Sequence, residues 1–212
     1  MRLYDYAASA NCYKARLLLA LLGRDHERVP TDIFAGDTLT DDFARLNPAR
    51  EVPVLELDDG TIVTQSNAIL WYLGEGTAFL PASALERAHC VQWLIFEQER
   101  VMHGIGGARF RLLTGRDPDV VPSRLAAGKS ALELLEAHLD GREWLVGDQC
   151  TIADIANFAY AHVADEGGLA LDTYAAVGRW LDRVRALPGF INDLAPYPEN
   201  ARPGLSRSIY DA

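Results

Sequence analysis

The chain has 212 residues, 49% of them hydrophobic, and a formal net charge of −10 at pH 7. This length can bury the core of one large domain or of two small ones. Nucleic acid and anionic membranes both repel an acidic surface, so neither is expected as a partner. Residues 1–6 predict a strand rather than a signal peptide, and no apolar run approaches the ~18 residues of a membrane-spanning helix.

The cysteines and histidines argue against a disulfide-rich protein and against a metal-binding protein. Three cysteines are too few for a disulfide framework, and Cys12, Cys90 and Cys150 lack the spacing of zinc ligands. A reduced, cytoplasmic protein is the simplest interpretation. The histidines also lie apart in the sequence, so we predict no metal site.

Residues 1–75 predict the element order strand, helix, strand, helix, strand, strand, helix. Gly23 ends the first helix, because glycine accepts the left-handed conformation that follows a helix C-terminus. Asp59-Gly60 is typical of the tight turn of a hairpin. Strands are expected at 2–6, 26–33, 52–57 and 62–64, and helices at 12–22, 41–46 and 66–74.

Strand signals vanish from Ala84 onward. The glycines within 104–107 are expected to loosen the first long helix. Thr151 and Asp154 have the spacing of a capping box, in which each side chain bonds the other residue's N–H. The proline-containing tail at 190–212 is predicted to be irregular. Helices are expected at 85–113, 122–139, 151–164 and 172–186.

Two features within residues 50–74 carry chemistry. Pro53 falls at the first residue of a strand, where a missing N–H is tolerated. If the Val52–Pro53 bond is cis, the backbone of Val52 turns outward, with its N–H and C=O free to pair with an extended peptide. Ser66 falls at a helix N-terminus, where unpaired N–H groups and the positive end of the helix dipole favour a carboxylate.

The ordered pattern around these residues resembles the glutathione-binding half of the cytosolic glutathione transferases. The matching segments are Asn47-Pro48, Glu51-Val52-Pro53-Val54-Leu55 and Gln65-Ser66-Asn67-Ala68-Ile69. With the helical second half, the resemblance covers the whole chain. It implies an α+β thioredoxin-like domain (βαβαββα) at 1–75, a linker at 76–83 and an all-α helical-bundle domain at 84–212.

The resemblance also implies an activity, transfer of the glutathione thiolate to small hydrophobic electrophiles, as in detoxification. Glutathione is then a co-substrate, and a homodimer is expected. A free thiol has a pKa near ~8.5, and lowering it by ~2 units needs roughly 2.7 kcal/mol of differential stabilisation. A hydroxyl or amide donor and a helix N-terminus can supply this free energy.

Related enzymes activate the thiol with Tyr, Ser or Cys at the end of the first strand or in the following loop. The candidates in that place are Ser9, Asn11 and Cys12, and more remotely Tyr4 and Tyr6. Counting back from the end of the first helix places Ser9 on the serine of serine-type classes and Asn11 on the cysteine of the bacterial cysteine-type class. We predict Ser9 as principal donor, assisted by Asn11 and the Cys12 N–H. Alternatively, Ser9 and Asn11 only cap the helix.

Cys12 has two interpretations of its own. A helix N-terminus lowers a thiol pKa, which would suit mixed-disulfide chemistry and a glutathione-dependent disulfide or peroxide reductase. Otherwise Cys12 is a small buried residue, which is the simpler interpretation. A third function is a non-catalytic binding or regulatory module, but the retained Val52-Pro53 and Gln65-Ser66 pairs argue against a site that has lost its ligand.

The ligand-holding residues follow from the resemblance. Val52 would bond the cysteinyl backbone, in a geometry that Pro53 shapes. The Gln65-Ser66 pair would hold the γ-glutamyl group. Glu51 stands where Gln or Lys is common and suits the glycyl carboxylate poorly, so the neighbouring Arg50 offers a compensating charge.

The helical half contributes weaker candidates. Glu99 and His103 are four residues apart and share a helix face. In the family, polar residues on this helix reach the γ-glutamyl amine bound to the partner subunit. Arg109, Phe110 and Tyr160 are candidate neighbours of the electrophile. The alternative is a solvated helix face for the charged residues and a core position for the aromatic ones.

Overall fold

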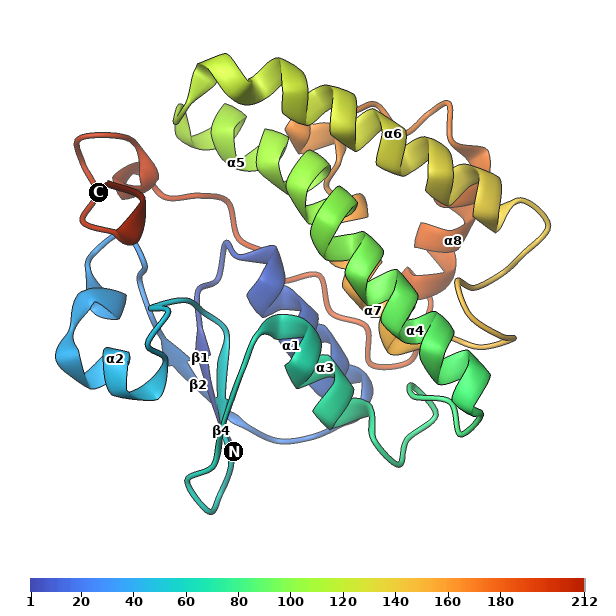
Figure 1. Cartoon of the computed structure of the whole chain (residues 1–212), viewed down its shortest axis with the longest axis horizontal. Helices are drawn as coiled ribbons and strands as arrows, with labels where there is room; N and C mark the ends of the chain where they lie inside the picture. The colour runs from blue at the N-terminus through green and yellow to red at the C-terminus, as the bar shows by residue number, and fades with distance from the viewer. Residues whose placement is uncertain (212) are drawn as a thin grey trace. The chain divides into compact units, whose positions relative to one another are not determined.

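The computed structural model describes residues 1–211, which divide into two compact units (Figure 1). One unit contains Met1–Leu73 together with the tail from Ile191, and the other contains Gly74–Phe190. None of the helices within residues 1–211 combines the length and apolarity that crossing a membrane requires.

The first unit has the predicted βαβαββα order. Its strands are β1 (Arg2–Asp5), β2 (Glu27–Pro30), β3 (Val54–Glu56) and β4 (Ile62–Thr64), and its helices are α1 (Ala10–Leu21), α2 (Asp41–Leu46) and α3 (Ser66–Gly74). The sheet order is β2-β1-β3-β4, with β1 parallel to β2 and antiparallel to β3, and β3 antiparallel to β4. The thioredoxin-like fold class is therefore confirmed.

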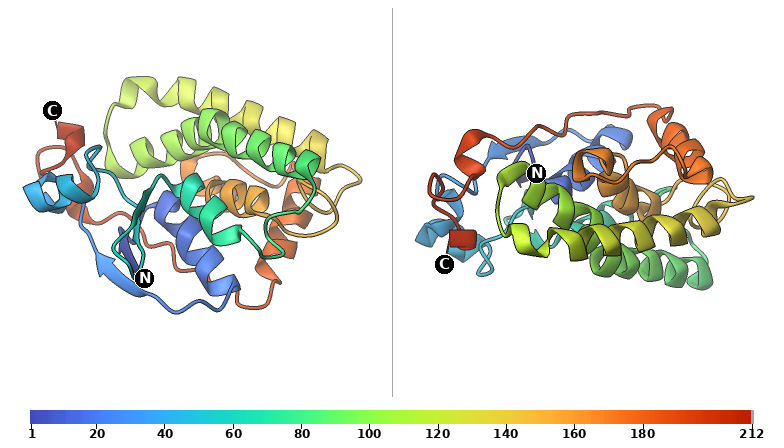
Figure 2. Two further views of the ribbon diagram at one scale, coloured as in Figure 1. Left: turned by 60° about the horizontal axis from the view of Figure 1, so that its bottom comes forward. Right: turned by 90° about the horizontal axis from the view of Figure 1, so that it is seen from above.

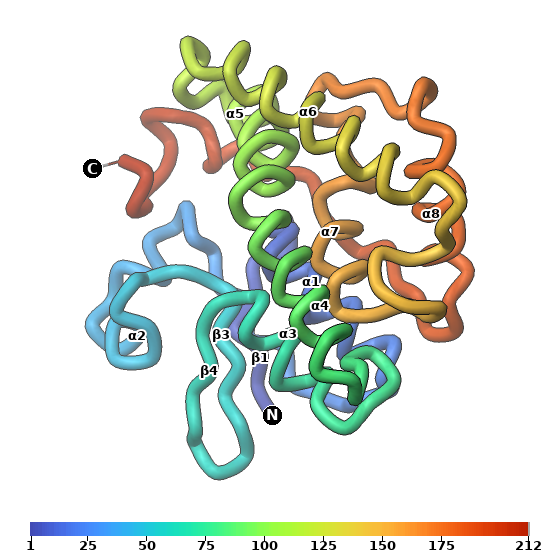
Figure 3. Tube along the Cα trace, turned by 45° about the vertical axis from the view of Figure 1, so that its right-hand side comes forward, coloured from blue at the N-terminus to red at the C-terminus, as the bar shows by residue number. Residues whose placement is uncertain are grey.

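Side-chain alternation along β1 places a helix layer on each face of this sheet. Leu3 and Asp5 are buried on the face that α1 covers, where Asp5 pairs with Arg16 of α1. Tyr4 points to the opposite face and packs edge-on against Phe43 of α2, with ring centroids 6.2 Å apart. Figure 3 shows α1 and α3 on one side of the strands and α2 on the other.

The predicted strand at 26–33 ends early. The side chain of Asp32 accepts hydrogen bonds from the N–H groups of Phe34 (2.9 Å) and Ala35 (3.2 Å), which turns the chain away from the sheet. Helix α1 begins two residues before its predicted start because Ser9 caps it. The bounds of α2, α3 and β4 agree with the prediction.

The second unit is helical, as predicted. Its helices are α4 (Ala84–Phe96), a π-helical stretch (Glu97–Gly106), α5 (Gly107–Thr114), α6 (Val121–Leu139), α7 (Ile152–Ala161) and α8 (Ala175–Arg185). This unit also has single 3₁₀ turns at Pro118–Val120 and Asp165–Gly167. The first unit has such turns at Asp37–Leu39, Glu199–Ala201 and Ile209–Asp211. Figure 2 shows the π-helical stretch and α5 running alongside α6.

The first long helix predicted at 85–113 is π-helical over Glu97–Gly106 and returns to α-helix at Gly107. Its glycines also allow close packing. A Cβ on Gly104 would lie 2.6 Å from the Cα of Gly128 on α6, and a Cβ on Gly106 would lie 2.5 Å from the ring of Tyr160. The backbones of the π-helical stretch and α6 can therefore approach because Gly104 lacks a side chain, and the Tyr160 ring packs against Gly106 for the same reason.

The capping box is confirmed. Thr151 Oγ1 accepts from the Ala153 N–H, and the buried Asp154 carboxylate accepts from the Thr151 N–H at 2.8 Å. Asp154 also accepts from the Leu145 N–H (3.0 Å) and the Trp180 indole N–H (2.9 Å), so it ties α7 to α8 and to the preceding loop.

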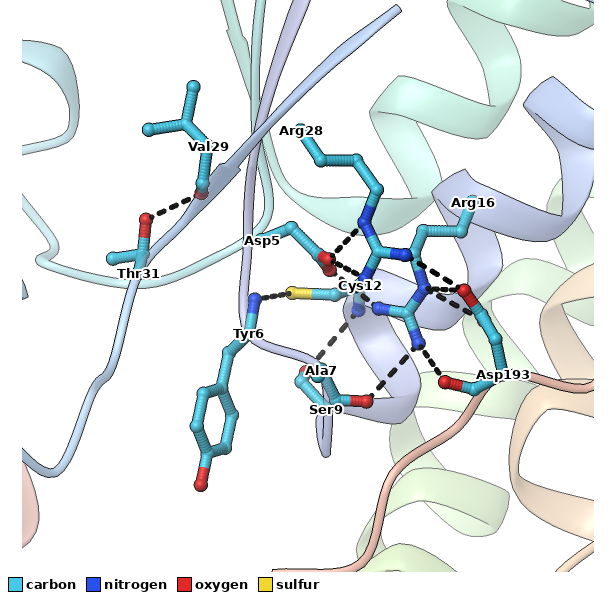
Figure 4. A network of polar contacts seen from close by, with 10 residues as sticks. All are labelled: Asp5, Tyr6, Ala7, Ser9, Cys12, Arg16, Arg28, Val29, Thr31 and Asp193. Carbon is cyan, nitrogen blue, oxygen red and sulfur yellow. Dashed lines mark hydrogen bonds and ion pairs between the residues drawn. The ribbon is translucent and has the colours of Figure 1, made fainter.

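The resemblance places the tail in the helical domain, whereas its contacts group it with the first unit. Arg16 is almost fully buried and donates to Asp193 at 2.9 Å and to Asp5 at 2.5 Å. Arg28 pairs with the same two carboxylates (Figure 4). An ion-pair network that crosses more than 160 residues of sequence left no local signal to predict it.

Candidate functional site

The turn before β3 exposes a backbone edge. The Val52–Pro53 peptide bond is cis. Asn47 holds the preceding turn, since its Nδ2 donates to the Glu51 C=O at 2.8 Å and its Oδ1 accepts from the Ala49 N–H at 3.1 Å. Across residues 1–211, no intramolecular hydrogen bond uses the N–H or C=O of Val52. One donor and one acceptor are thus available to an extended peptide.

The N-terminus of α3 lies next along the chain. Ser66 is its first residue and is 4% exposed. Gln65, directly before it, has φ 70°, a left-handed conformation that residues other than glycine seldom adopt and that is frequent at binding sites. The Gln65 amide is exposed and donates to Glu51 Oε2 at 3.2 Å. The first-turn N–H groups of α3 have no helical acceptor, as at any helix start.

Ser9 is the N-cap of α1. Its Oγ accepts from the Cys12 N–H at 3.3 Å, and its C=O accepts from the Tyr13 N–H at 2.9 Å. The Ser9 O–H itself has no acceptor among residues 1–211 and can donate to a ligand. The Cys12 N–H is used by this cap, and its assisting role toward a thiol stays a prediction.

A buried polar cluster joins α1 to α3. Asn11 Oδ1 accepts from Lys14 Nζ (2.9 Å) and from the Ser66 hydroxyl (3.1 Å). Lys14 Nζ also donates to Ser66 Oγ (3.2 Å) and to Asn67 Oδ1 (3.3 Å). Lys14 is not among the residues predicted from the sequence, although its spacing of three residues from Asn11 puts both on one helix face.

The prediction that the helix N-terminus lowers the pKa of Cys12 is wrong. The thiol is fully buried, and burial raises its pKa to about 12, with the Asp5 charge adding to the shift. Its Sγ accepts from the Tyr6 N–H at 3.4 Å (Figure 4). Cys12 is therefore a packing residue and a poor nucleophile.

Two remote candidates for thiol activation, Tyr4 and Tyr6, and the candidate compensating charge of Arg50 lie in the following surroundings. Tyr4 faces the α2 side of the sheet and donates to Glu56 at 2.9 Å. Burial raises the pKa of the Tyr6 phenol further above its usual value. Arg50 donates to the backbone carbonyls of Thr38 (3.0 Å) and Thr40 (3.1 Å), so its charge holds a loop rather than compensating for Glu51.

The candidates from the helical half lie within the second unit, each in different surroundings. Glu99 and His103 are exposed, and His103 contacts the Arg124 guanidinium. Arg109 is buried and pairs with Glu166 at 2.6 Å. Tyr160 packs on the glycine backbone described above, and Phe110 is half-buried.

A cavity of about 390 Å³ lies within the first unit, beside the loop that carries Ser9. It is lined by the end of β1, the end of β2 and the tail, through Tyr6, Ala7, Ala8, Thr31, Pro196 and Pro198 among others. Among the residues described, no group of three His, Cys, Asp or Glu side chains could ligate a metal ion.

Comparison with known proteins gives matches in both units. Residues 8–75 match the glutathione S-transferase N-terminal domain and residues 105–188 the glutathione S-transferase C-terminal domain. A glutathione S-transferase structure from Xanthobacter autotrophicus Py2 is 43% identical, with a TM-score of 0.87 over 92% of this chain and 97% of its own.

Two other relatives extend this result. Maleylacetoacetate isomerase from Pseudomonas aeruginosa is 29% identical over 201 residues, covering 90% of this chain and 93% of the relative. A glutathione transferase homologue from Lodderomyces elongisporus, solved with two glutathione molecules per subunit, is 25% identical, with a TM-score of 0.80 over 89% of this chain and 94% of its own.

Proposed function

Because the chain belongs to the glutathione transferase family, we propose that it transfers the glutathione thiolate to a small hydrophobic electrophile. One observation carries the proposal. The thioredoxin-like unit contains the unpaired backbone edge of Val52, the N-terminus of α3 and the Ser9 O–H, which donates to no acceptor within residues 1–211. These are the groups that a tripeptide with a carboxylate at one end and a thiol in its middle requires.

Glutathione binds along this edge in the proposal. The Val52 N–H and C=O pair with the cysteinyl backbone. The Ser66 hydroxyl and the first N–H groups of α3 hold the γ-glutamyl carboxylate. The Gln65 side chain, which bonds Glu51 at 3.2 Å, flanks the γ-glutamyl group.

Ser9 lowers the thiol pKa in this proposal, which makes the protein resemble the serine-type classes. A hydrogen bond to a charged group contributes about 1.5–3 kcal/mol. That free energy corresponds to a pKa shift of about 1–2 units. The dipole of α1 adds about 0.3–1 kcal/mol at its N-terminus. The thiol proton leaves to solvent, the sulfur lone pair forms the C–S bond, and the leaving group departs with its electron pair.

The test must separate the Ser9 hydroxyl donor from the Ser9 helix cap. Ser9→Ala removes both, so we expect kcat/KM for a chlorinated aromatic electrophile to fall about 10–100-fold at neutral pH. It should also lose about 1 kcal/mol of stability. Ser9→Asp keeps the cap acceptor but cannot donate a hydrogen bond to the thiolate. It should therefore be as stable as the wild type and as inactive as Ser9→Ala. Ser9→Asn keeps both functions and is the matched control.

Two outcomes would contradict the proposal. Wild-type protein without turnover across a broad electrophile panel would rule out conjugation. Full activity in Ser9→Asp would rule out Ser9 as donor. The expected homodimer and cytoplasmic location stay predictions, which sedimentation and cell fractionation can check.

A glutathione-dependent isomerase is a second candidate, favoured by the similarity to maleylacetoacetate isomerase. The same thiolate would add to a conjugated cis double bond, allow rotation and leave again, so that glutathione is regenerated. Turnover of maleylacetoacetate with catalytic amounts of glutathione would support this reaction. A cysteine-based reductase is disfavoured, because Cys12 is buried and its pKa is raised.

A further inference from the structure

Lysine is rare in this chain, and its two lysines lie in opposite environments. Lys14 and Lys129 are the only lysines in the sequence. Lys129 on α6 has an exposed side chain, with a relative accessibility of 67%. Lys14 on α1 is completely buried. A buried ammonium group loses its hydration, and lysine is seldom fully buried unless its charge is paired or hydrogen-bonded.

The Lys14 ammonium lies against the residue that begins α3. It donates to Ser66 Oγ at 3.2 Å and to Asn11 Oδ1 at 2.9 Å. The Ser66 hydroxyl donates in turn to the same Asn11 oxygen at 3.1 Å. The Ser66 oxygen therefore accepts from a cation while its proton is shared with a neutral amide.

We propose that Lys14 is a positioning residue that makes the Ser66 site selective for a carboxylate. The inference rests on the proposed function, in which Ser66 holds the γ-glutamyl carboxylate of glutathione. When a carboxylate arrives, the Ser66 proton turns from Asn11 to the ligand. The Lys14 ammonium still donates to Asn11, so the amide oxygen is not left unsatisfied.

The cation also strengthens the Ser66 donor. A hydroxyl whose oxygen accepts from an ammonium group is polarised, and hydrogen bonds in such a chain reinforce one another. The full burial of Lys14 keeps solvent from screening its charge. A neutral carboxamide in place of the carboxylate gains neither effect, so Lys14 discriminates by ligand charge.

The experiment compares two ligands on matched variants. The ligands are glutathione and the same tripeptide with its γ-glutamyl α-carboxylate converted to a carboxamide. The variants are Lys14→Gln and Lys129→Gln, which remove the same charge from a buried and an exposed position. Calorimetry gives each dissociation constant, and far-ultraviolet circular dichroism checks the folding of both proteins.

We expect Lys14→Gln to weaken glutathione binding about 10-fold or more, as for a lost charge-assisted interaction. Carboxamide binding should change less than about twofold, so the preference for glutathione collapses. The KM for glutathione should rise while kcat at saturating glutathione stays constant. Lys129→Gln should match the wild type. Equal weakening of both ligands would reduce Lys14 to a packing residue, and no weakening would also overturn the inference.

A second measurement needs no variant and covers the case in which Lys14→Gln fails to fold. Lysine labelled with ¹⁵N gives two side-chain signals in the wild type. Glutathione should shift the buried Lys14 signal and leave the Lys129 signal in place, whereas the carboxamide should shift Lys14 far less. An unshifted Lys14 signal at saturating glutathione would overturn the inference. Wild-type protein that binds no glutathione at millimolar concentration would instead overturn the proposed function.

Discussion

Removal of the Asp154 carboxylate should destabilise the helical unit more than most single substitutions. The carboxylate accepts four hydrogen bonds, from the Thr151 N–H (2.8 Å), the Thr151 hydroxyl (3.0 Å), the Leu145 N–H (3.0 Å) and the Trp180 indole (2.9 Å). Burial raises the pKa of Asp154, and these donors oppose that shift. Asp154→Ala leaves all four donors without their acceptor in a fully buried site.

The magnitude follows from those contacts. Breaking a buried charged network of this kind costs about 3–5 kcal/mol, because losses within one network do not add independently. For a protein of this size each kcal/mol lowers Tm by about 2–4 °C, so Asp154→Ala should melt about 6–20 °C below the wild type. Asp154→Asn can still accept from Leu145 and Trp180 through one oxygen, so about half of the loss is expected.

Urea unfolding, followed by tryptophan fluorescence and circular dichroism, measures both variants. Trp180 is a direct reporter, since its indole N–H bonds Asp154. A loss below about 1 kcal/mol for Asp154→Ala would refute the reasoning, because it would mean that the four donors find other acceptors. Equal losses for the two variants would refute the assignment of two bonds to each oxygen.

Three further predictions follow from buried groups. Gly104→Ala should lower the free energy of unfolding by about 3 kcal/mol or more, because its Cβ meets the Gly128 backbone. Gly178→Ala has open space around its Cβ, so its free energy of unfolding should be unchanged or rise by up to about 1 kcal/mol. Equal urea midpoints for the two variants would contradict this prediction. The three cysteines should resist a thiol reagent until the protein unfolds, and Cys12→Ala should remain active; rapid labelling of native Cys12 would contradict its burial. Burial lowers the pKa of His162 to about 4, so the unfolded state binds the extra proton and stability falls as pH drops from about 6.5 toward 4. Between pH 7 and about pH 5 the wild type should therefore lose about 1–2 kcal/mol more than His162→Gln, and parallel pH profiles of the two proteins would show the premise to be mistaken.

Local chemistry accounts for what could be predicted from the sequence. The Asp59-Gly60 turn and the Asp41–Leu46 and Ser66–Gly74 helices were placed correctly, because turn residues and caps act over a few positions. The capping box of Thr151 and Asp154 was likewise recognised from spacing alone. The candidate ligand residues around Val52 came from a resemblance, and their roles stay predictions.

Tertiary packing accounts for what was missed. The sequence places Cys12 in the first turn of a helix, but it cannot show that β1 and α1 bury the thiol and raise its pKa. The grouping of the tail with the first unit could not be predicted, because Asp193 and Arg16 meet only in the folded chain. Lys14 was overlooked since a lysine is ordinarily a surface residue, and only the structure shows Ser66 beside its ammonium group.

The pKa of protein-bound glutathione tests the central claim most directly. Thiolate absorbance in the ultraviolet, recorded against pH at saturating glutathione, gives this value for the wild type and for Ser9→Ala. We expect the pKa of the bound thiol in the wild type to lie about 1–2 units below the ~8.5 of a free thiol. In Ser9→Ala the pKa of the bound thiol should rise most of the way back to the free value. A bound thiol that titrates like free glutathione in the wild type would contradict thiolate stabilisation by this site.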